Sequence, residues 1–323
     1  MRNILIDGDP GHDDVIAFLN VLANPEQFHI LGFTTVAGNA TVENTTSNIL
    51  RIMDYLNVRI PVAKGYGEPL CRPAYTAAKF HGETGLDGFR DMPVPFSKPV
   101  SEHAIVFLRD QILGSDEKVT LLTLGPLTNV AMLVKTFPEV KDRIEEIVMM
   151  GGSFASGNML AKSEFNMFFD PEAAKIVFDS GIRIVMASME ACYSGGVLLS
   201  EQERFKEGGK ASRLVYDLLK FYSRYAISNG WDRTAIYDLT PVIYLLEPEI
   251  FTYREMRVDI ETDGEYTRGM TVCDDRGPTY IEPCQQPKKV LLSVDRDRLV
   301  EILFADMKRL DERLQGAEWN ISE

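Results

Sequence analysis

Four carboxylates lie close together near the beginning of the chain. The segment Asp7–Asp14 reads Asp-Gly-Asp-Pro-Gly-His-Asp-Asp and follows an apolar run, Asn3–Ile6, that predicts a buried strand. Proline and glycine in its middle favour a turn, and the last acids favour the start of a helix. Capping accounts for one or two acids but not for four. Like-charged carboxylates raise one another's pKa unless a cation joins them, and a hard divalent ion suits oxygen ligands best. The segment therefore predicts a metal site, with helix capping as the alternative.

The elements that must position these acids alternate between short apolar strands and helical patterns, which predicts βαβ units and a largely parallel sheet. Ligands bind at the carboxyl ends of such strands, where the acids lie. The chain is therefore expected to form one α/β domain, residues 1–323, with an open, mostly parallel (mixed) Rossmann-like sheet flanked by helices and a more helical C-terminal part. Strands are expected over Asn3–Ile6, His29–Val36, Val119–Thr123, Ile144–Met150, Arg183–Ala187 and Val290–Val294, and helices over Asp14–Leu22, Thr46–Leu56, Leu127–Val134, Pro171–Phe178 and Arg296–Leu310.

The pattern changes in the last third of the chain. Ser200–Ser228 is expected to be helical, and Phe251–Val272 alternates as antiparallel strands do. The loop Gly65–Pro99 is long, and long loops in compact domains are usually functional or mobile.

Composition narrows the class of protein. The 323 residues carry a net charge of −14, which argues against binding to nucleic acid or to anionic lipid. The four cysteines lack zinc spacing and are expected to be reduced thiols. The N-terminal apolar run is too short for a signal peptide, and no run approaches the roughly 20 residues that span a bilayer. A soluble, cytoplasmic protein is expected.

Seven sequence blocks in order make the interpretation specific. They are Asp7–Asp14, Val36–Asn39 (Val-Ala-Gly-Asn), His81–Leu86 (His-Gly-Glu-Thr-Gly-Leu), Leu124–Asn129 (Leu-Gly-Pro-Leu-Thr-Asn), Met149–Gly152, Glu164–Asn166 with Asp170–Ala174, and Tyr237-Asp238. Together they resemble the inosine–uridine-preferring nucleoside hydrolase family over nearly the whole chain. Two departures stand out: Gly8 replaces the usual Thr, and Tyr237 replaces a His that usually precedes the final Asp.

The resemblance implies a calcium-dependent cleavage of the N-glycosidic bond of ribonucleosides. It implies Ca²⁺ ligands at Asp9, Asp14, the backbone carbonyl of Leu124 and Asp238, with Asp9 also acting as general base to the attacking water. It implies ribose contacts from Asp13, Asn39, Asn158, Glu164 and Asn166, with Met150 beside the sugar. The family forms dimers and tetramers, so a homodimer or homotetramer is expected.

The chemistry agrees with these residue types. N-glycosidic cleavage builds positive charge on the sugar, which carboxylate and amide oxygens such as those of Glu164 and Asn166 stabilise. A departing base gains from a proton donor. Tyr237 is a weaker acid than imidazolium, since an unperturbed phenol has a pKa near 10. Either Tyr237 acts as acid or hydrogen-bond donor, or another group does, or water does. His81 could face the base or solvent.

Two aromatic residues upstream of Tyr237 could contact the nucleobase, and the sequence alone does not decide their roles. Tyr225 and Trp231 could stack on a nucleobase, although Tyr225 could equally belong to the core face of a helix. A pyrimidine or broad preference is expected. Two rivals remain: a phosphohydrolase of the haloacid dehalogenase type, which would use the Asp-x-Asp spacing of Asp7 and Asp9, and a non-catalytic nucleoside-binding protein.

Overall fold

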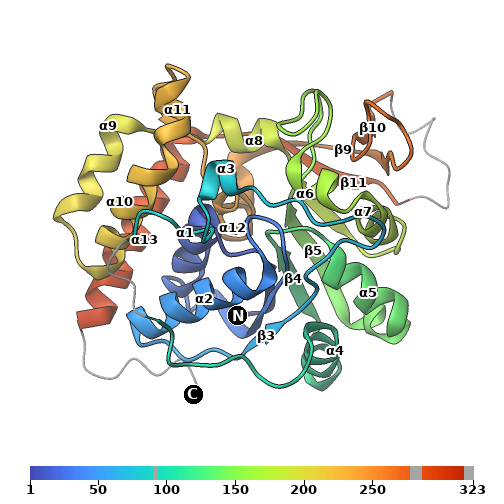
Figure 1. Cartoon of the computed structure of the whole chain (residues 1–323), viewed down its shortest axis with the longest axis horizontal. Coiled ribbons are helices and arrows are strands. Elements are labelled where there is room, and N and C mark those ends of the chain that lie inside the picture. The colour runs from blue at the N-terminus through green and yellow to red at the C-terminus, as the bar shows by residue number, and fades with distance from the viewer. Residues whose placement is uncertain (90–93, 277–285, 316–323) are drawn as a thin grey trace.

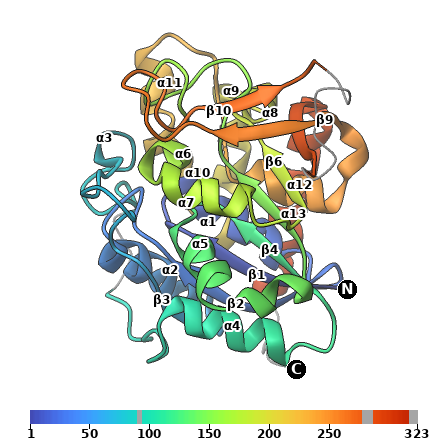
Figure 2. The ribbon, with the colours of Figure 1, turned by 90° about the vertical axis from the view of Figure 1, so that its right-hand side faces the viewer.

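A nine-stranded sheet runs through the molecule, with helices on both faces (Figures 1 and 2). The computed structural model describes residues 1–89, 94–276 and 286–315. The strand order is β10-β9-β11-β6-β5-β4-β1-β2-β3, with every pairing parallel except those of β9 with β10 and β11. The strands are β1 (Arg2–Gly8), β2 (Phe28–Thr35), β3 (Val62–Lys64), β4 (Val119–Thr123), β5 (Ile144–Met150), β6 (Ile184–Ala187), β9 (Phe251–Ile260), β10 (Thr271–Asp274) and β11 (Lys288–Val294). The predicted mixed, mostly parallel sheet is confirmed.

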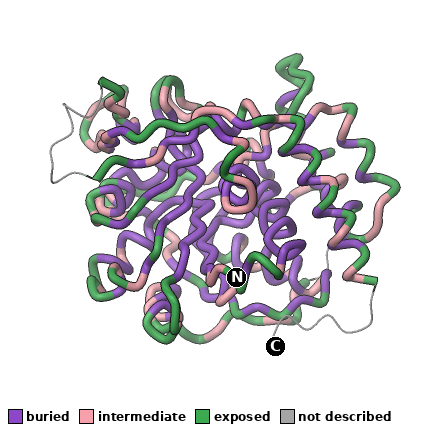
Figure 3. Tube along the Cα trace, turned by 180° about the vertical axis from the view of Figure 1, so that it is seen from behind, coloured by how far each residue is buried: buried purple, intermediate pink, exposed green. Residues whose placement is uncertain are grey.

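Alternation along β1 shows how the sheet supports two helical layers. Ile4 and Ile6 belong to one buried cluster and Leu5 to the other, because successive side chains of a strand point to opposite faces. The first face packs against α1 (His12–Leu22), α2 (Val42–Leu56), α10 (Lys210–Tyr222), α12 (Leu239–Leu246) and α13 (Arg296–Gln315). The second packs against α4 (Ala104–Gly114), α5 (Thr128–Thr136) and α7 (Pro171–Phe178). The central strands are accordingly buried (Figure 3).

The C-terminal part contains the expected helices and antiparallel strands, but one predicted helical stretch is interrupted. Ser200–Ser228 is divided into α9 (Leu199–Gln202), a 3₁₀ turn over Glu203–Glu207, α10 and α11 (Arg224–Ser228). Gly208 and Gly209 interrupt it before α10, where a Cβ at Gly209 would lie 2.7 Å from Asp311. Helical periodicity identified the helices, but it does not reveal a break that close packing imposes.

The loops at the carboxyl edge of the sheet contain several short helices and strands. The long loop of residues 65–99 contains α3 (Ala78–His81), and its residues 90–93 lie outside the described part. Others are α6 (Phe165–Phe169), α8 (Met189–Ser194), and the two-stranded pair β7 (Val197–Leu198) and β8 (Arg233–Thr234).

The cysteines and the helices agree with the sequence expectations where they are described. Cys71, Cys192 and Cys273 are free thiols, and Cys284 lies outside the described residues. Within those residues, no helix combines the length and apolar character that crossing a membrane requires.

A buried aspartate of α13 fixes the start of α10. The carboxylate of Asp311 accepts hydrogen bonds from the backbone N–H groups of Gly209 (2.8 Å), Ala211 (2.7 Å) and Ser212 (3.2 Å), and from the Ser212 hydroxyl (2.5 Å). These N–H groups have no partner inside the helix, so the carboxylate satisfies them and complements the helix dipole. The contact therefore joins α13 to the start of α10, which leads into α11.

Replacing this cap should destabilise the protein. Asp311→Ala leaves the first turn of α10 without its acceptor, so the free energy of unfolding should fall by about 2 kcal/mol. The measurement is thermal or urea unfolding followed by circular dichroism. Glu312→Ala, at the exposed neighbouring position, is the matched control. Equal stability of the two variants would show that the cap contributes nothing.

Candidate active site

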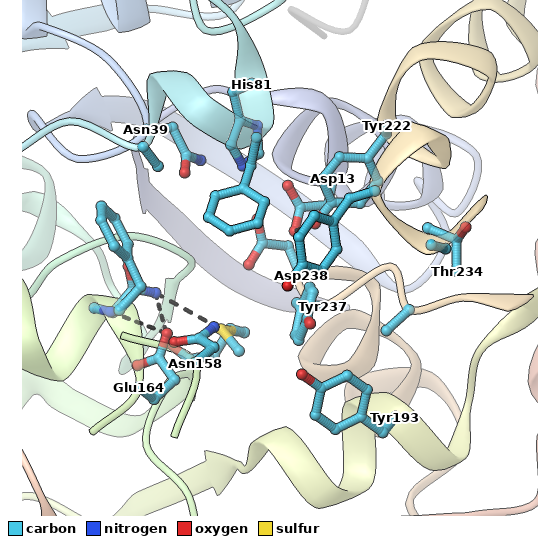
Figure 4. Close-up of a pocket in the computed structure, with 18 of the residues that line it drawn as sticks. Asp13, Asn39, His81, Asn158, Glu164, Tyr193, Tyr222, Thr234, Tyr237 and Asp238 are labelled. Carbon is cyan, nitrogen blue, oxygen red and sulfur yellow. Dashed lines mark hydrogen bonds between the residues drawn. The ribbon is translucent and has the colours of Figure 1, made fainter. Parts of the chain in front are cut away.

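A cavity of about 940 Å³ opens at the carboxyl ends of the parallel strands (Figure 4). Asp9 and Asp13 follow β1, Asn39 follows β2, Leu124 follows β4, and Met150 ends β5. Because parallel strands end at the same edge, segments far apart in sequence meet there. The cavity has the size typical of a small-molecule site.

The structure brings the residues predicted from the sequence together. All of them line this cavity except Asp14, which lies beneath it and contacts the same acids. The lining set is Asp9, Asp13, Asn39, His81, Leu124, Met150, Asn158, Glu164, Asn166, Tyr225, Trp231, Tyr237 and Asp238. Their roles stay predictions.

Three buried carboxylates form the floor of the cavity. Asp13, Asp14 and Asp238 each offer an oxygen atom, and these atoms lie within 4.8 Å of one another. Burial raises the pKa of Asp13 to about 6. Burial, and then the charge of Asp13, raises the pKa of Asp14 to about 7. The pKa of Asp238 is raised well above its usual range by burial and by the charges of Asp13 and Asp14. Three anions at this spacing repel one another strongly.

The three-carboxylate cluster fits a hard divalent cation. One carboxylate oxygen of Asp13, Oδ1, is buried without a hydrogen-bond partner. Within the described part of the chain, no arginine or lysine forms an ion pair with Asp13, Asp14 or Asp238. Carboxylates and backbone carbonyls are the donors that calcium prefers, and no histidine or cysteine belongs to the cluster.

Asp9 is held by backbone on two sides. Its Oδ2 accepts a hydrogen bond of 2.7 Å from the backbone N–H of Asn39. A Cβ at Gly38 would lie 2.1 Å from Oδ2, and one at Gly125 would lie 2.6 Å from Oδ1. Both glycines belong to the sequence blocks identified above, and here they leave the space that the Asp9 carboxylate occupies. Burial, and then the charge of Asp14, raises the pKa of Asp9 well above its usual range.

An amide and a carboxylate from α6 form the opposite wall. The side-chain N–H₂ of Asn166 donates to the carbonyls of Leu124 (2.8 Å) and Met150 (3.2 Å). Carbonyls only accept, so these bonds fix the amide orientation and leave its oxygen available to the cavity. Glu164 accepts backbone N–H bonds from Asn166 (2.9 Å), Gly152 (3.0 Å) and Met167 (3.2 Å). Burial nevertheless raises the pKa of Glu164 to about 7.

His81 is buried and lines the cavity. The alternative that it faces solvent is therefore wrong. Burial lowers its pKa to about 3, so the ring is neutral. His12 lies behind it, with Nδ1 3.3 Å from Nδ1 of His81 and Nε2 2.7 Å from the carbonyl of Asp87. A carbonyl requires a donor, so a neutral His12 carries its proton on Nε2. The backbone N–H of His12 also donates to Nδ1 of His81, at 3.5 Å.

The entrance to the cavity is aromatic. Tyr225 stands edge-to-face against Phe80 (4.9 Å between ring centroids) and against Trp231 (5.8 Å). Tyr225 is 41% exposed and Trp231 46%, so the alternative that Tyr225 belongs to a core helix face is wrong. Large exposed rings beside a polar cavity offer flat surfaces on which a heterocycle can stack.

Sequence reasoning missed several cavity residues. Tyr222 donates a hydrogen bond of 3.1 Å to Asp13, Tyr193 lies beside Tyr237, and Thr234 lies at the wall (Figure 4). They come from helices α10 and α8 and from strand β8, outside the sequence blocks that carried the resemblance. Tyr222 lies in the stretch Ser200–Ser228, which was predicted only to be helical.

Comparison with known proteins defines the class. The family model described as inosine-uridine preferring nucleoside hydrolase matches residues 4–301. The chain therefore belongs to the nucleoside hydrolase family, whose members are hydrolases acting on N-glycosyl compounds and depend in general on a metal ion. The resemblance inferred from the sequence blocks is confirmed.

Individual relatives and solved structures are also nucleoside hydrolases. The pyrimidine-specific ribonucleoside hydrolase RihA of Klebsiella pneumoniae subsp. pneumoniae is 41% identical over 304 residues, which cover 93% of this chain and 96% of that protein. Among solved structures, a plant nucleoside hydrolase, the PpNRh1 enzyme, has a TM-score of 0.88 at 26% identity, covering 95% of this chain and 99% of its own. A purine-preferring ribonucleoside hydrolase from Gardnerella vaginalis has a TM-score of 0.88 at 27% identity, covering 98% and 100%.

The space around Asp9 can be tested by one methyl group. Gly38→Ala places a Cβ against the Asp9 carboxylate and should displace it, so kcat/KM should fall about 100-fold while the fold is retained. Gly114→Ala is the matched control, because its Cβ would meet nothing within 4 Å. Nucleoside hydrolysis and circular dichroism are the measurements. Equal activity of the two variants would mean that the position of Asp9 does not matter.

Proposed function

We propose that this nucleoside hydrolase cleaves pyrimidine ribonucleosides to ribose and free base, with calcium at the buried carboxylates and Asp9 as general base. The observation that carries the proposal is the cluster of Asp13, Asp14 and Asp238, buried at the floor of a nucleoside-sized cavity, with which no arginine or lysine of the described residues forms an ion pair.

The residues that would hold the cation are Asp9, Asp14, Asp238 and the backbone carbonyl of Leu124. Asp13 lies close enough to join them, although the sequence resemblance assigned it to ribose. Asn166 already donates to the Leu124 carbonyl, but a carbonyl oxygen has two lone pairs and can serve both partners. When bound, calcium would supply a Lewis acid that neutralises the carboxylates and makes a nearby water more acidic.

Asp9 is suited to remove the proton from the attacking water. Its backbone cradle restricts the carboxylate to one position at the cavity, which is the positioning that general base catalysis requires.

Asn166 and Glu164 are suited to stabilise the sugar. As the glycosidic bond breaks, positive charge develops on the anomeric carbon and the ring oxygen. The fixed amide oxygen of Asn166 faces the cavity without needing to reorient, which is the form of electrostatic stabilisation that contributes most to catalysis. We assign Asp13, Asn39, Asn158, Glu164 and Met150 to the ribose side.

The base side is assigned to aromatic residues and His81. Tyr225 and Trp231 would stack on the heterocycle, and Tyr237 would serve the departing base, either as its hydrogen-bond donor or by orienting a neighbouring donor. Burial lowers the pKa of His81 to about 3, so its neutral ring suits a hydrogen bond to the base or sugar better than it suits proton donation as an acid. The pyrimidine preference is supported by the RihA relatives at about 40% identity.

The rival phosphohydrolase requires Asp7 as a nucleophile. Instead, Asp7 is buried against Thr34 (2.5 Å) and the amide of Asn129 (2.7 Å), and it does not line the cavity. A non-catalytic binding protein would need no buried base, whereas Asp9 lies at the cavity in a raised-pKa environment. Action in the cytoplasm as a homodimer or homotetramer stays a prediction.

Calcium dependence is tested by chelation. EDTA treatment should abolish release of uracil from uridine, and added Ca²⁺ should restore it, because the carboxylates repel one another without a cation. Ca²⁺ should also raise the thermal midpoint of the chelated protein by several degrees, an effect that Asp238→Asn should remove. Asp142→Asn, at an exposed position, is the control. Full activity in EDTA would exclude the metal role.

A substrate panel tests the sugar and base assignments. The kcat/KM for uridine and cytidine should exceed that for inosine and guanosine by about tenfold, a difference of roughly 1.4 kcal/mol. Deoxyuridine should be about 10⁴-fold poorer than uridine, because its missing hydroxyl leaves buried polar partners unpaired. Comparable rates for uridine and deoxyuridine would contradict the ribose assignment.

A further inference from the structure

Two tyrosines of the cavity wall form a pair. Tyr193 on α8 and Tyr237 just before α12 stand edge-to-face, with ring centroids 5.6 Å apart and planes at 70°. The two phenols affect each other's pKa, as neighbouring hydroxyls within reach of a hydrogen bond do. Both rings line the cavity, and their oxygens face one another below Asp238 (Figure 4).

The pair has one hydrogen to offer to a ligand. Two phenols that share a hydrogen bond use one O–H between them, so the other O–H needs a partner. Tyr193 is 40% exposed, so its oxygen reaches the open space of the cavity. Tyr237 is more enclosed, and its main-chain carbonyl accepts a hydrogen bond of 3.5 Å from the buried thiol of Cys192. The arrangement that satisfies both groups has Tyr237 donating to Tyr193, and Tyr193 donating to the cavity.

A departing nucleobase needs such a donor. When the glycosidic bond breaks, its electron pair stays on the base nitrogen and spreads to the carbonyl oxygen of the ring. A hydrogen bond that strengthens as this charge develops accelerates cleavage, as oxyanion donors do. We propose that Tyr193 is a further catalytic residue, which donates this hydrogen bond to the departing base, and that Tyr237 is the residue that positions it.

The inference rests on the proposed function and adds a residue that the sequence blocks do not contain. Tyr193 keeps its proton throughout: burial raises its pKa, so the phenol acts by hydrogen bonding. The attacking water supplies hydroxide to the anomeric carbon and a proton to Asp9. The base anion takes its proton from solvent, and Asp9 returns its proton to solvent, so the charges balance.

Comparing two leaving groups isolates this role. For Tyr193→Phe, kcat on uridine should fall about 100-fold, with KM changed less than threefold. On 4-nitrophenyl β-D-ribofuranoside the same variant should lose less than threefold in kcat, because nitrophenolate leaves without a hydrogen bond. Tyr237→Phe should show the same pattern more weakly. The double variant should lose no more than Tyr193→Phe, since residues that act as a unit are not additive.

Controls separate the outcomes. Tyr253→Phe, on β9 at the surface, removes a hydroxyl away from the cavity and should behave as wild type. Tyr193→Gln keeps an N–H donor and should retain more uridine turnover than Tyr193→Phe, which also covers a Phe variant that misfolds. Equal loss on both substrates, or unchanged uridine turnover in Tyr193→Phe, would overturn the role of Tyr193. Failure of the wild type to release base from any ribonucleoside would instead overturn the proposed function.

Discussion

Repulsion among buried carboxylates is the constraint on which the rest of the structure depends. Asp13, Asp14 and Asp238 each bring an oxygen atom within 4.8 Å of the others in a buried site, and among the described residues no arginine or lysine forms an ion pair with them. A fold carries such an arrangement at a cost to its stability. Here the acids are held in place by the core, because Asp13 and Asp14 lie in the first turn of the buried helix α1, directly after the central strand β1. The acids cannot move apart without disrupting the core.

Backbone groups also hold the polar side chains of the site, and glycines in the sequence blocks leave the space that those side chains occupy. Gly38 and Gly125 come from two different strand ends, yet both leave room for the same carboxylate, Asp9. Asn166 fixes its orientation on two main-chain carbonyls, and Glu164 on three main-chain N–H groups. Main-chain partners cannot rotate away as side chains do, so Asn166 and Glu164, which we assign to the ribose, are held in fixed positions.

Some parts of the fold and of the site could be predicted from the sequence, and others could not. Most strands were predictable because their apolar runs are buried, and most residues assigned to the ribose because they lie in compact sequence blocks. On the aromatic side, Tyr225 and Trp231 were anticipated, but Tyr193 and Tyr222 were not, because they lie on helices where an aromatic residue usually indicates core packing. The break within Ser200–Ser228 was missed although Gly208-Gly209 is a typical turn signal, and its cap, Asp311, lies about one hundred positions away in the sequence.

The hydrogen bond from Tyr222 to Asp13 joins the two halves of the cavity. Tyr222 ends α10, which continues into α11 and its exposed aromatic rings, whereas Asp13 belongs to the acid floor. A change in the charge on Asp13 therefore alters the same contact that anchors the aromatic wall. By thermodynamic linkage, occupancy of the floor and ordering of the wall must influence each other equally. Ion affinity in this enzyme is thus expected to depend on which heterocycle occupies the entrance.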